Sequence, residues 1–330
     1  MTPVPGALAP PLSFSLLGRR VRLGRSTRAL RSLLAYHYHR PAIARAERGT
    51  GIALSVRPGP RVPRALQDRL PDTAAGSSAA TQPVWRQEDE ACSLVLLGDR
   101  AEGVMLRLRP SGAQVHAWGR LEVEGPGQLQ LLLALQEALL ASGLVPLHCA
   151  AAVAPGERGA TAFLAPSGVG KSSTVVRAAR AGWDPVCEDV AWYDPDSARL
   201  FGWDLELRLL PDVVGELGQV TSEPVPGETK RAVPFAEIER LFGVRRRTEV
   251  PLERVVLLRR GGGSSHWEPL ERVVAVSALW EAVGLPLTQR VRDQVALRVA
   301  RLSAQVPLAT LWLAASPEPM PAPPERAVRR

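Results

Sequence analysis

A short glycine-rich segment contains the residues whose types and spacing point most clearly to chemistry. Residues 165–172 match the pattern G-x-x-x-x-G-K-[ST] at every position but the first, where alanine replaces glycine. In such a loop, glycines let backbone N–H groups surround phosphate oxygens, lysine reaches the β- and γ-phosphates, and the hydroxyl can bind Mg²⁺. The segment therefore predicts a phosphate-binding loop, formed by Ala165, Pro166, Ser167, Gly168, Val169, Gly170, Lys171, Ser172 and Ser173.

The sequence on both sides of this loop supports the interpretation. Residues 160–164 predict a buried strand, and residues 171–181 predict an amphipathic helix that ends at Gly182. A helix that begins at the loop directs its unpaired N–H groups toward the same anion. Lys171 is also one of only two lysines among 41 cationic residues, the other being Lys230. An ammonium group here indicates a role that the planar fork of arginine would not fill.

Two adjacent acidic residues, Glu188 and Asp189, follow Lys171 by 17 and 18 residues. We expect one strand at 186–193 to run beside the loop strand and carry both acids to the loop. One carboxylate could then anchor Mg²⁺ while the other accepts a proton from an attacking hydroxyl, and we assign Ser172 and Asp189 as the metal ligands. Neighbouring residues of a strand point to opposite faces, so both acids can act only at a bulge or a strand end. The alternative is an exposed acidic pair that binds no metal.

His148 lies in an apolar segment, residues 147–153, that predicts the strand before the loop strand. The turn between the two strands, residues 155–159, is of a hairpin type. A single histidine on an apolar strand is either a hydrogen-bonded core residue or a residue directed at the loop. The residues alone leave both possibilities open.

The elements that must position these residues form an α/β domain preceded by a β-rich segment. Short apolar or alternating runs predict a β-meander, at residues 93–97, 104–108, 114–118 and 121–123. Residues 128–141 predict a well-buried helix. Further strands are expected at 205–209, 232–235 and 255–258, and two more helices at 273–283 and 288–302. We divide the chain into a basic region with a linker (1–83), the β-rich segment (84–125), an ATP-binding domain (126–315) and a disordered tail (316–330).

The positive charge is concentrated in the first quarter of the chain. The formal net charge is +8, yet residues 1–80 hold 13 arginines against three acidic residues, and the remainder is close to neutral. This region is either the solvated face of an arginine-rich domain or a binding region for an anionic partner. Its densest group is Arg19, Arg20, Arg22, Arg25, Arg28 and Arg31. The nearby YHYH segment at 36–39 favours a loop or a strand over a metal site.

Composition also excludes several classes of protein. No stretch approaches the roughly 18 apolar residues that a membrane-spanning helix needs, and the N-terminus lacks the basic segment of a signal peptide. The three cysteines are odd in number and have no CxxC spacing, which argues against a disulfide framework or a zinc site. We therefore expect a cytoplasmic protein without a membrane span.

Taken together, residues 147–196 resemble the catalytic domain of the HPr kinase/phosphorylase family. The resemblance rests on the order of a His-bearing strand, a phosphate loop and an acidic pair, and it spans about residues 128–285. It extends to LELRLLPD at 205–212, TKRAVPF at 229–235 and LERVVLLRRG at 252–261. It implies a P-loop kinase domain related in fold to phosphoenolpyruvate carboxykinase, with a smaller N-terminal α+β region.

The same resemblance implies ATP and Mg²⁺ as cofactors and assigns roles to several residues. Glu188 and Asp189 stand where the family usually has two aspartates, which supply a base and a metal contact. His148 corresponds to a histidine near the transferred phosphate, and Arg208, Lys230 and Arg231 correspond to basic positions that meet phosphate. The C-terminal signature for phosphorolysis is not recognisable, and residues 1–120 do not resemble the regulatory domain of the bifunctional enzymes.

The resulting functional hypothesis is an ATP-dependent kinase that phosphorylates a serine of a protein or peptide, with small precursor peptides among the candidate substrates. One alternative is a nucleotide-binding regulator or scaffold without transfer activity, which Ala165 and Glu188 favour. The other is a small-molecule kinase. A deep pocket beside Glu188 would favour a small acceptor, whereas an open groove would favour a peptide. The chain could also form a homo-oligomer.

Overall fold

The computed structural model describes residues 12–23, 51–56, 85–87, 92–97, 103–109, 112–118, 126–261, 263–314 and 320–323. The chain forms two compact units, one of Met1–Leu144 with Leu285–Val295, the other of Val145–Gly284 with Ala296–Arg330. Several predictions lie outside the described residues, namely those for Arg25, Arg28, Arg31 and residues 36–39, 71–83 and 121–123, and most of those for the tail at 316–330. Within the described residues, no helix has the length and apolar character that crossing a membrane requires.

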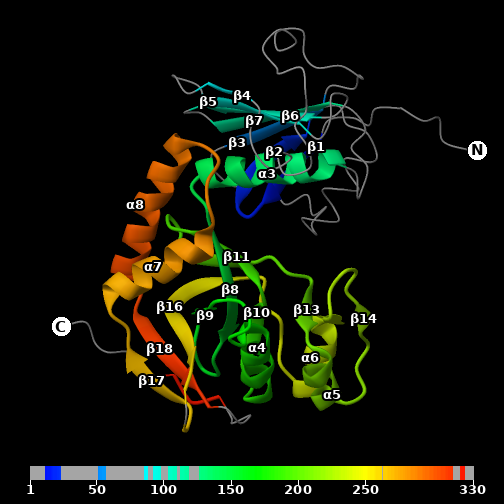
Figure 1. Ribbon diagram of the computed structural model, residues 1–330, viewed down its shortest axis with the longest axis vertical. Helices are drawn as coiled ribbons and strands as arrows, with labels where there is room; N and C mark the ends of the chain where they lie inside the picture. Colours follow the sequence, from blue (N-terminus) through cyan, green and yellow to red (C-terminus); the bar gives the residue numbers. More distant parts are fainter. Residues whose placement is uncertain are drawn as a thin grey trace, which may run out of the picture. The chain divides into compact units, whose positions relative to one another are not determined.

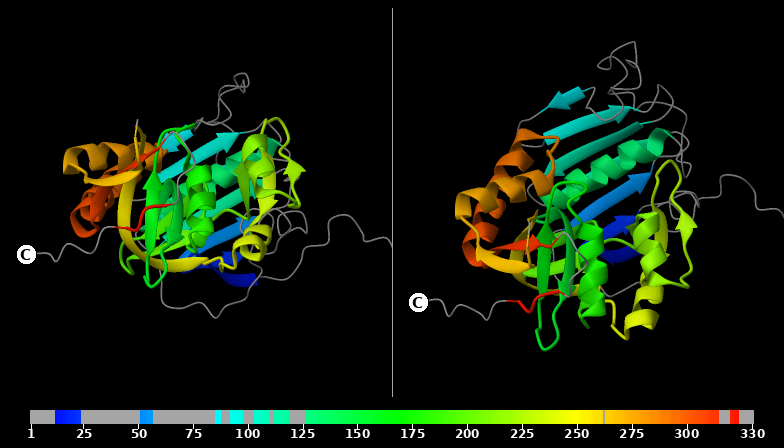
Figure 2. Two further views of the ribbon diagram at one scale, coloured as in Figure 1. Left: turned by 90° about the horizontal axis from the view of Figure 1, so that it is seen from below. Right: turned by 60° about the horizontal axis from the view of Figure 1, so that its bottom comes forward.

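The first unit is a seven-stranded sheet with one helix packed on it (Figures 1 and 2). In order across the sheet the strands are β1 (Leu12–Leu16), β2 (Arg19–Leu23), β3 (Gly51–Val56), β7 (Gly112–Trp118), β6 (Gly103–Arg109), β5 (Cys92–Leu97) and β4 (Trp85–Gln87). The β5–β6–β7 meander predicted from the sequence is confirmed, since these strands pair antiparallel in that order. Alternate residues of β6 are fully buried, including Val104 and Leu106, and α3 (Pro126–Ala141) contacts β6 and β7. The helix predicted at 128–141 therefore belongs to this unit.

The second unit is built on a mixed eight-stranded sheet, which makes it an α/β structure (Figure 1). Its strands are β8 (Val145–Val153), β9 (Ala160–Leu164), β10 (Asp184–Cys187), β11 (Val190–Asp194), β12 (Arg199–Gly202), β16 (Glu249–Arg260), β17 (His266–Pro269) and β18 (Leu308–Leu313). The predicted hairpin of β8 and β9 is confirmed by their antiparallel pairing. Strands β9, β16 and β18 are parallel neighbours, so their carboxyl ends meet at one edge of the sheet.

Helices cover this second sheet. On one side, α4 (Lys171–Arg180) packs Val175 and Val176 in one core cluster with Ala150, Phe163 and Val256 of three neighbouring strands. The helix α7 (Arg272–Val283) contacts β8 and β9, and α8 (Gln289–Gln305) follows it along the chain. The predicted helices at 171–181, 273–283 and 288–302 are thus confirmed within a few residues.

A smaller three-stranded sheet completes the second unit. Its order is β13 (Glu206–Leu209), β15 (Arg231–Pro234) and β14 (Glu223–Pro224), and it is accompanied by α5 (Pro211–Leu217) and α6 (Phe235–Phe242). The strands expected at 205–209 and 232–235 are present, although Phe235 begins α6 and does not end β15. The two short helices were not predicted.

The prediction of one strand at 186–193 is wrong. The structure has two strands, β10 and β11, separated at Glu188 and Asp189, and both pair with β8 and not with the loop strand β9. The break has a clear cause, because the backbone N–H groups of residues 188–190 donate to the carboxylate of Asp204. Since β8 is antiparallel to both β9 and β10, these two strands still run in the same direction and end at the same edge.

Candidate functional site

The predicted phosphate loop connects the carboxyl end of β9 to the first residue of α4. Gly168 and Gly170 have φ angles of 82° and 118°, in the left-handed region that favours glycine. A Cβ at Gly168 would meet nothing within 4 Å, so the backbone conformation and not crowding requires glycine there. No side chain caps the N-terminus of α4, which leaves its first N–H groups available to an anion.

Lys171 is buried at the start of α4, with its side chain folded back over the loop. Its Nζ donates a hydrogen bond to the carbonyl oxygen of Ala165 at 2.8 Å. Burial lowers the pKa of Lys171, and the positive charge of Lys230 adds to this effect, whereas the charge of Asp189 is the largest influence that opposes it.

Glu188 lies inside the structure, 3% exposed, and its side chain faces the first turn of α4. Its Oε1 accepts a hydrogen bond from the hydroxyl of Ser172, and its Oε2 accepts one from the backbone N–H of Arg208 at 3.4 Å. Burial raises the pKa of Glu188 to about 7; the hydrogen bond from Ser172 opposes this rise, and the charges of Asp189 and Asp204 add to it. A buried carboxyl group that titrates near neutral pH is typical of functional sites.

Asp189 contacts His148 of β8. Its Oδ1 lies 3.2 Å from Nδ1 of His148, and both side chains are partly exposed, His148 by 45% and Asp189 by 40%. His148 is the one exposed residue of β8, all of which is described. The structure therefore excludes the core interpretation of His148 and pairs this side chain with one of the two acids.

The positions of the two acids differ from the assignment made from the sequence. Ser172 and Asp189 were expected to hold the metal together, but the structure brings Glu188 to Ser172 and Asp189 to His148. Glu188 and Asp189 lie at the break between β10 and β11. Even so, their side chains contact different partners, as successive residues of a strand also would.

Asp204, which sequence reasoning missed, creates this break. Its Oδ2 accepts hydrogen bonds from the backbone N–H groups of Glu188 at 2.7 Å, Asp189 at 2.8 Å and Val190 at 3.1 Å. Burial raises the pKa of Asp204, and these three hydrogen bonds oppose the rise. The guanidinium of Arg246 donates to the carbonyl oxygen of Asp204 and lies 4.2 Å from the centre of the Phe235 ring. No spacing in the sequence connects residue 204 to residue 188.

The three basic residues expected to meet phosphate differ in their surroundings. The guanidinium of Arg208 pairs with Glu228 at 3.3 Å, and the contact of Arg208 with Glu188 is made by its backbone. Arg231 donates from Nε and Nη2 to the hydroxyl and carbonyl oxygens of Ser222, both at 2.8 Å, which joins β15 to the segment before β14. Of the three, Lys230 is the one whose charge acts on Lys171.

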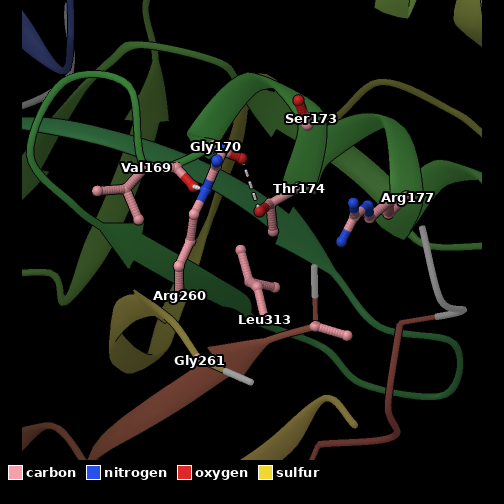
Figure 3. Close-up of a pocket in the computed structure, with 9 residues that line it drawn as sticks. Val169, Gly170, Ser173, Thr174, Arg177, Arg260, Gly261 and Leu313 are labelled. Carbon is pink, nitrogen blue, oxygen red and sulfur yellow. Dashed lines mark hydrogen bonds between the residues drawn. The ribbon is translucent and has the colours of Figure 1, made fainter. Parts of the chain in front are cut away.

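Two cavities lie at the two ends of the loop. One, of about 220 Å³, is lined by His148, by residues 165–167 at the start of the loop, and by Ala278 and Glu281 of α7. The other, of about 200 Å³, is lined by Val169 and Gly170 at the end of the loop, the first turns of α4, and the ends of β16 and β18 (Figure 3). Neither cavity is lined by Glu188.

Comparison with known proteins adds little to this geometry. No protein-family model matches the chain, and no curated protein matches it. Among solved structures, the Hpr(Ser) kinase/phosphatase from Coxiella burnetii matches with 10% sequence identity and a TM-score of 0.25, over 52% of this chain and 80% of that chain. A superposition at this level assigns neither fold nor activity, so the function must be argued from the site itself.

Proposed function

We propose that the second unit is an ATP- and Mg²⁺-dependent phosphotransferase that transfers a γ-phosphoryl group to a serine hydroxyl of a protein or peptide. The single observation that carries this proposal is the convergence of two acids on one glycine-rich loop. Glu188 contacts the Ser172 hydroxyl beside Lys171, while Asp189 contacts His148. A metal-binding oxygen pair and a proton-accepting pair are the two parts that hydroxyl phosphorylation needs in addition to a phosphate cradle.

The residues present fit a nucleoside triphosphate with bound Mg²⁺. The left-handed glycines Gly168 and Gly170 and the uncapped N-terminus of α4 would bind phosphate oxygens through backbone N–H groups, and Lys171 would contact the β- and γ-phosphates. Ser172 and Glu188 offer hard oxygen donors to Mg²⁺, which when bound would neutralise charge on the phosphates. Among the described residues no group of three His, Cys, Asp or Glu side chains is arranged around a metal. Mg²⁺ usually takes one or two protein carboxylates together with waters and phosphates.

His148 and Asp189 would accept the proton that the acceptor hydroxyl loses. With Nδ1–H of His148 directed at the Asp189 carboxylate, Nε2 is the nitrogen that carries a free lone pair. As the serine oxygen forms its bond to the γ-phosphorus, the bond from that phosphorus to the bridging oxygen of ADP breaks, and the hydroxyl proton passes to Nε2. Asp189 then stabilises the imidazolium by its negative charge.

The exposure of this pair favours a large acceptor over a small one. The side chains of His148 and Asp189 are open to solvent by nearly half, so a serine on the surface of a peptide or protein can approach them. The specific choice of serine rests on the sequence resemblance. The contact between Glu188 and Ser172 also supports phosphotransfer activity. Glutamate is longer than the aspartate that the family usually has at this position, yet its carboxylate still contacts Ser172, as expected of a metal-binding acid.

The proposal is tested with purified protein, ATP, Mg²⁺ and a pool of peptides that differ only in carrying serine or alanine at one position. We expect phosphopeptides from the serine pool only, as detected by mass spectrometry. Lys171→Ala should abolish the product. Arg180→Ala should retain it, because Arg180 lies at the other end of α4 and makes an exposed ion pair with Glu216 of α5.

Two further variants separate the roles of the acids. Glu188→Gln should raise the Mg²⁺ concentration needed for half-maximal rate, since one ligand loses its charge. Asp189→Asn should lower kcat by about 10²- to 10⁴-fold with little change in the Mg²⁺ requirement, because it removes the partner of the proton acceptor. Equal product from wild type and Lys171→Ala would refute the proposed function, and exchange of the two expected phenotypes would refute the division of roles.

A further inference from the structure

The cavity of about 200 Å³ at the end of the loop is not used by the phosphate chemistry described above. It lies where the parallel strands β16 and β18 end, beside the first turns of α4. In sheets with parallel strands, ligands bind outside the carboxyl ends of those strands. Figure 3 shows Arg260, Leu313 and Arg177 around this space, with Arg260 extending to the loop. The Nε of Arg260 donates to the carbonyl oxygen of Val169 at 3.0 Å, so this side chain joins the strand end to the loop.

The direction of a bound nucleotide follows from the side of the loop on which the acids lie. Lys171 points back to the Ala165 carbonyl oxygen, and His148, the proposed proton acceptor, lines a cavity together with residues 165–167, which places the γ-phosphate end at the start of the loop. The α-phosphate must then lie toward the first turn of α4, near Ser173. The cavity lined by Gly170, Ser173 and Arg177 lies at that point, and His148 is not part of its lining.

The size and lining of the cavity suit a nucleobase. An apolar cavity of about 150 Å³ accepts a benzene ring in a well-studied case, so a space of this volume admits a larger aromatic ring system. Leu313 and Ala314 supply an apolar wall, and the guanidinium groups of Arg177 and Arg260 can stack on the face of an aromatic ring. Among the described residues that line it, none carries a carboxylate or amide side chain that would select a base by its edge.

We propose that this cavity binds the purine base and ribose of the nucleotide, with Arg260 and Arg177 against the base and Leu313 beneath it. This inference rests on the proposed function, because it takes the phosphates to lie on the loop.

The experiment compares two ligands that share the phosphates and differ in the nucleoside. Calorimetry gives the affinities of ATP and of inorganic tripolyphosphate, each with Mg²⁺, for the full chain and three variants. Leu313→Trp fills the cavity, Arg260→Leu removes a stacking cation while keeping bulk, and Arg259→Leu is the matched control. Arg259 precedes Arg260 on β16, and its guanidinium lies 5.7 Å from the centre of the Trp312 ring, outside the cavity lining.

We expect wild type to bind ATP more tightly than tripolyphosphate. Leu313→Trp should weaken ATP by at least about tenfold and leave tripolyphosphate within about threefold, since only the base is displaced. Arg260→Leu should also lower the ratio of the two affinities, by about two- to tenfold, and Arg259→Leu should leave the ratio unchanged. Should Leu313→Trp fail to fold by circular dichroism, the Arg260→Leu ratio decides.

The inference is overturned if the ratio of the ATP and tripolyphosphate affinities stays at the wild-type value in Arg260→Leu and in a folded Leu313→Trp. The base would then lie elsewhere. If wild type binds neither ligand, the proposed function itself fails. If wild type binds both ligands equally tightly, phosphate binding stands and the nucleoside site is refuted.

Discussion

Replacing Glu188 by glutamine tests the electrostatics at the centre of the candidate site. This side chain is 3% exposed, and burial raises its pKa from 4.5 to about 7. The unfolded chain exposes the same carboxyl to water, where it keeps its ordinary pKa. At 1.36 kcal/mol for each pKa unit, the shift corresponds to about 3 kcal/mol of folding free energy.

The sign of this effect follows from which state holds the proton. Below pH 4.5 the carboxyl is protonated in both states and its ionisation costs nothing. As the pH rises from 4.5 to 7, the unfolded chain releases its proton first, so the free energy of unfolding falls. Above pH 7 both states are ionised and the full cost remains. Glutamine keeps the shape of the side chain without the charge, so Glu188→Gln should exceed wild type by less than about 1 kcal/mol at pH 5 and by about 3 kcal/mol at pH 8.

Urea denaturation of the metal-free protein, followed by tryptophan fluorescence between pH 5 and pH 8 in the presence of a chelator, measures this difference. Titrations common to both proteins cancel when the two free energies are subtracted. The control is Glu216→Gln, because Glu216 is exposed and its pair with Arg180 at 3.5 Å is worth at most about 1 kcal/mol. A difference between Glu188→Gln and wild type that does not change with pH, or a less stable variant at pH 8, would refute the reasoning.

Three further changes have expected outcomes of different kinds. Gly170→Ala should cost about 1 to 3 kcal/mol in urea denaturation and weaken ATP binding in calorimetry, because φ at this residue is 118°; unchanged stability and affinity would contradict the conformational argument. His148→Gln should lower kcat by about 10²- to 10⁴-fold with little effect on the KM for ATP, and a variant that affects only KM would remove His148 from the proton-accepting role. Asp204→Ala should lower the free energy of unfolding by about 3 kcal/mol, since three backbone N–H groups lose their acceptor. A cost as small as that of Asp212→Ala, an exposed change in the first turn of α5, would show that the break does not depend on this carboxylate.

Much of the local structure could be predicted because it depends on residues close in sequence. The loop between β9 and α4, the β8–β9 hairpin and the helix that ends before Gly182 all follow from glycine spacing and apolar periodicity. The two lysines could be singled out by their rarity, and one of them, Lys171, is buried at the start of α4. The short helix α5 and the strand β18 escaped prediction, because their few residues have no clear period of their own. Helix α6 was missed although Phe235, Ile238, Leu241 and Phe242 have helical spacing, since its first residue was assigned to a strand over 232–235.

The arrangement of the acids could not be predicted, because it depends on a contact over 16 residues. A single strand at 186–193 was the natural expectation for an apolar run, and only the carboxylate of Asp204 interrupts it by taking three N–H groups from the strand ladder. In the structure the contact with Ser172 is made by Glu188, whereas the sequence had assigned it to Asp189. Sequence resemblance suggested that Arg231 meets phosphate, whereas packing commits its guanidinium to Ser222.

The sequence by itself determined that a glycine-rich loop joins a buried strand to a helix, and that lysine, serine and an acidic pair occur at spacings suited to phosphate and Mg²⁺. These features depend on backbone conformations and periodicities that neighbouring residues set. Only the tertiary structure decided which acid contacts Ser172 and which one contacts His148. It also decided that Arg260 lines a cavity at the end of the loop. Those choices depend on long-range hydrogen bonds and on the edge at which parallel strands end, and neither is encoded in local spacing.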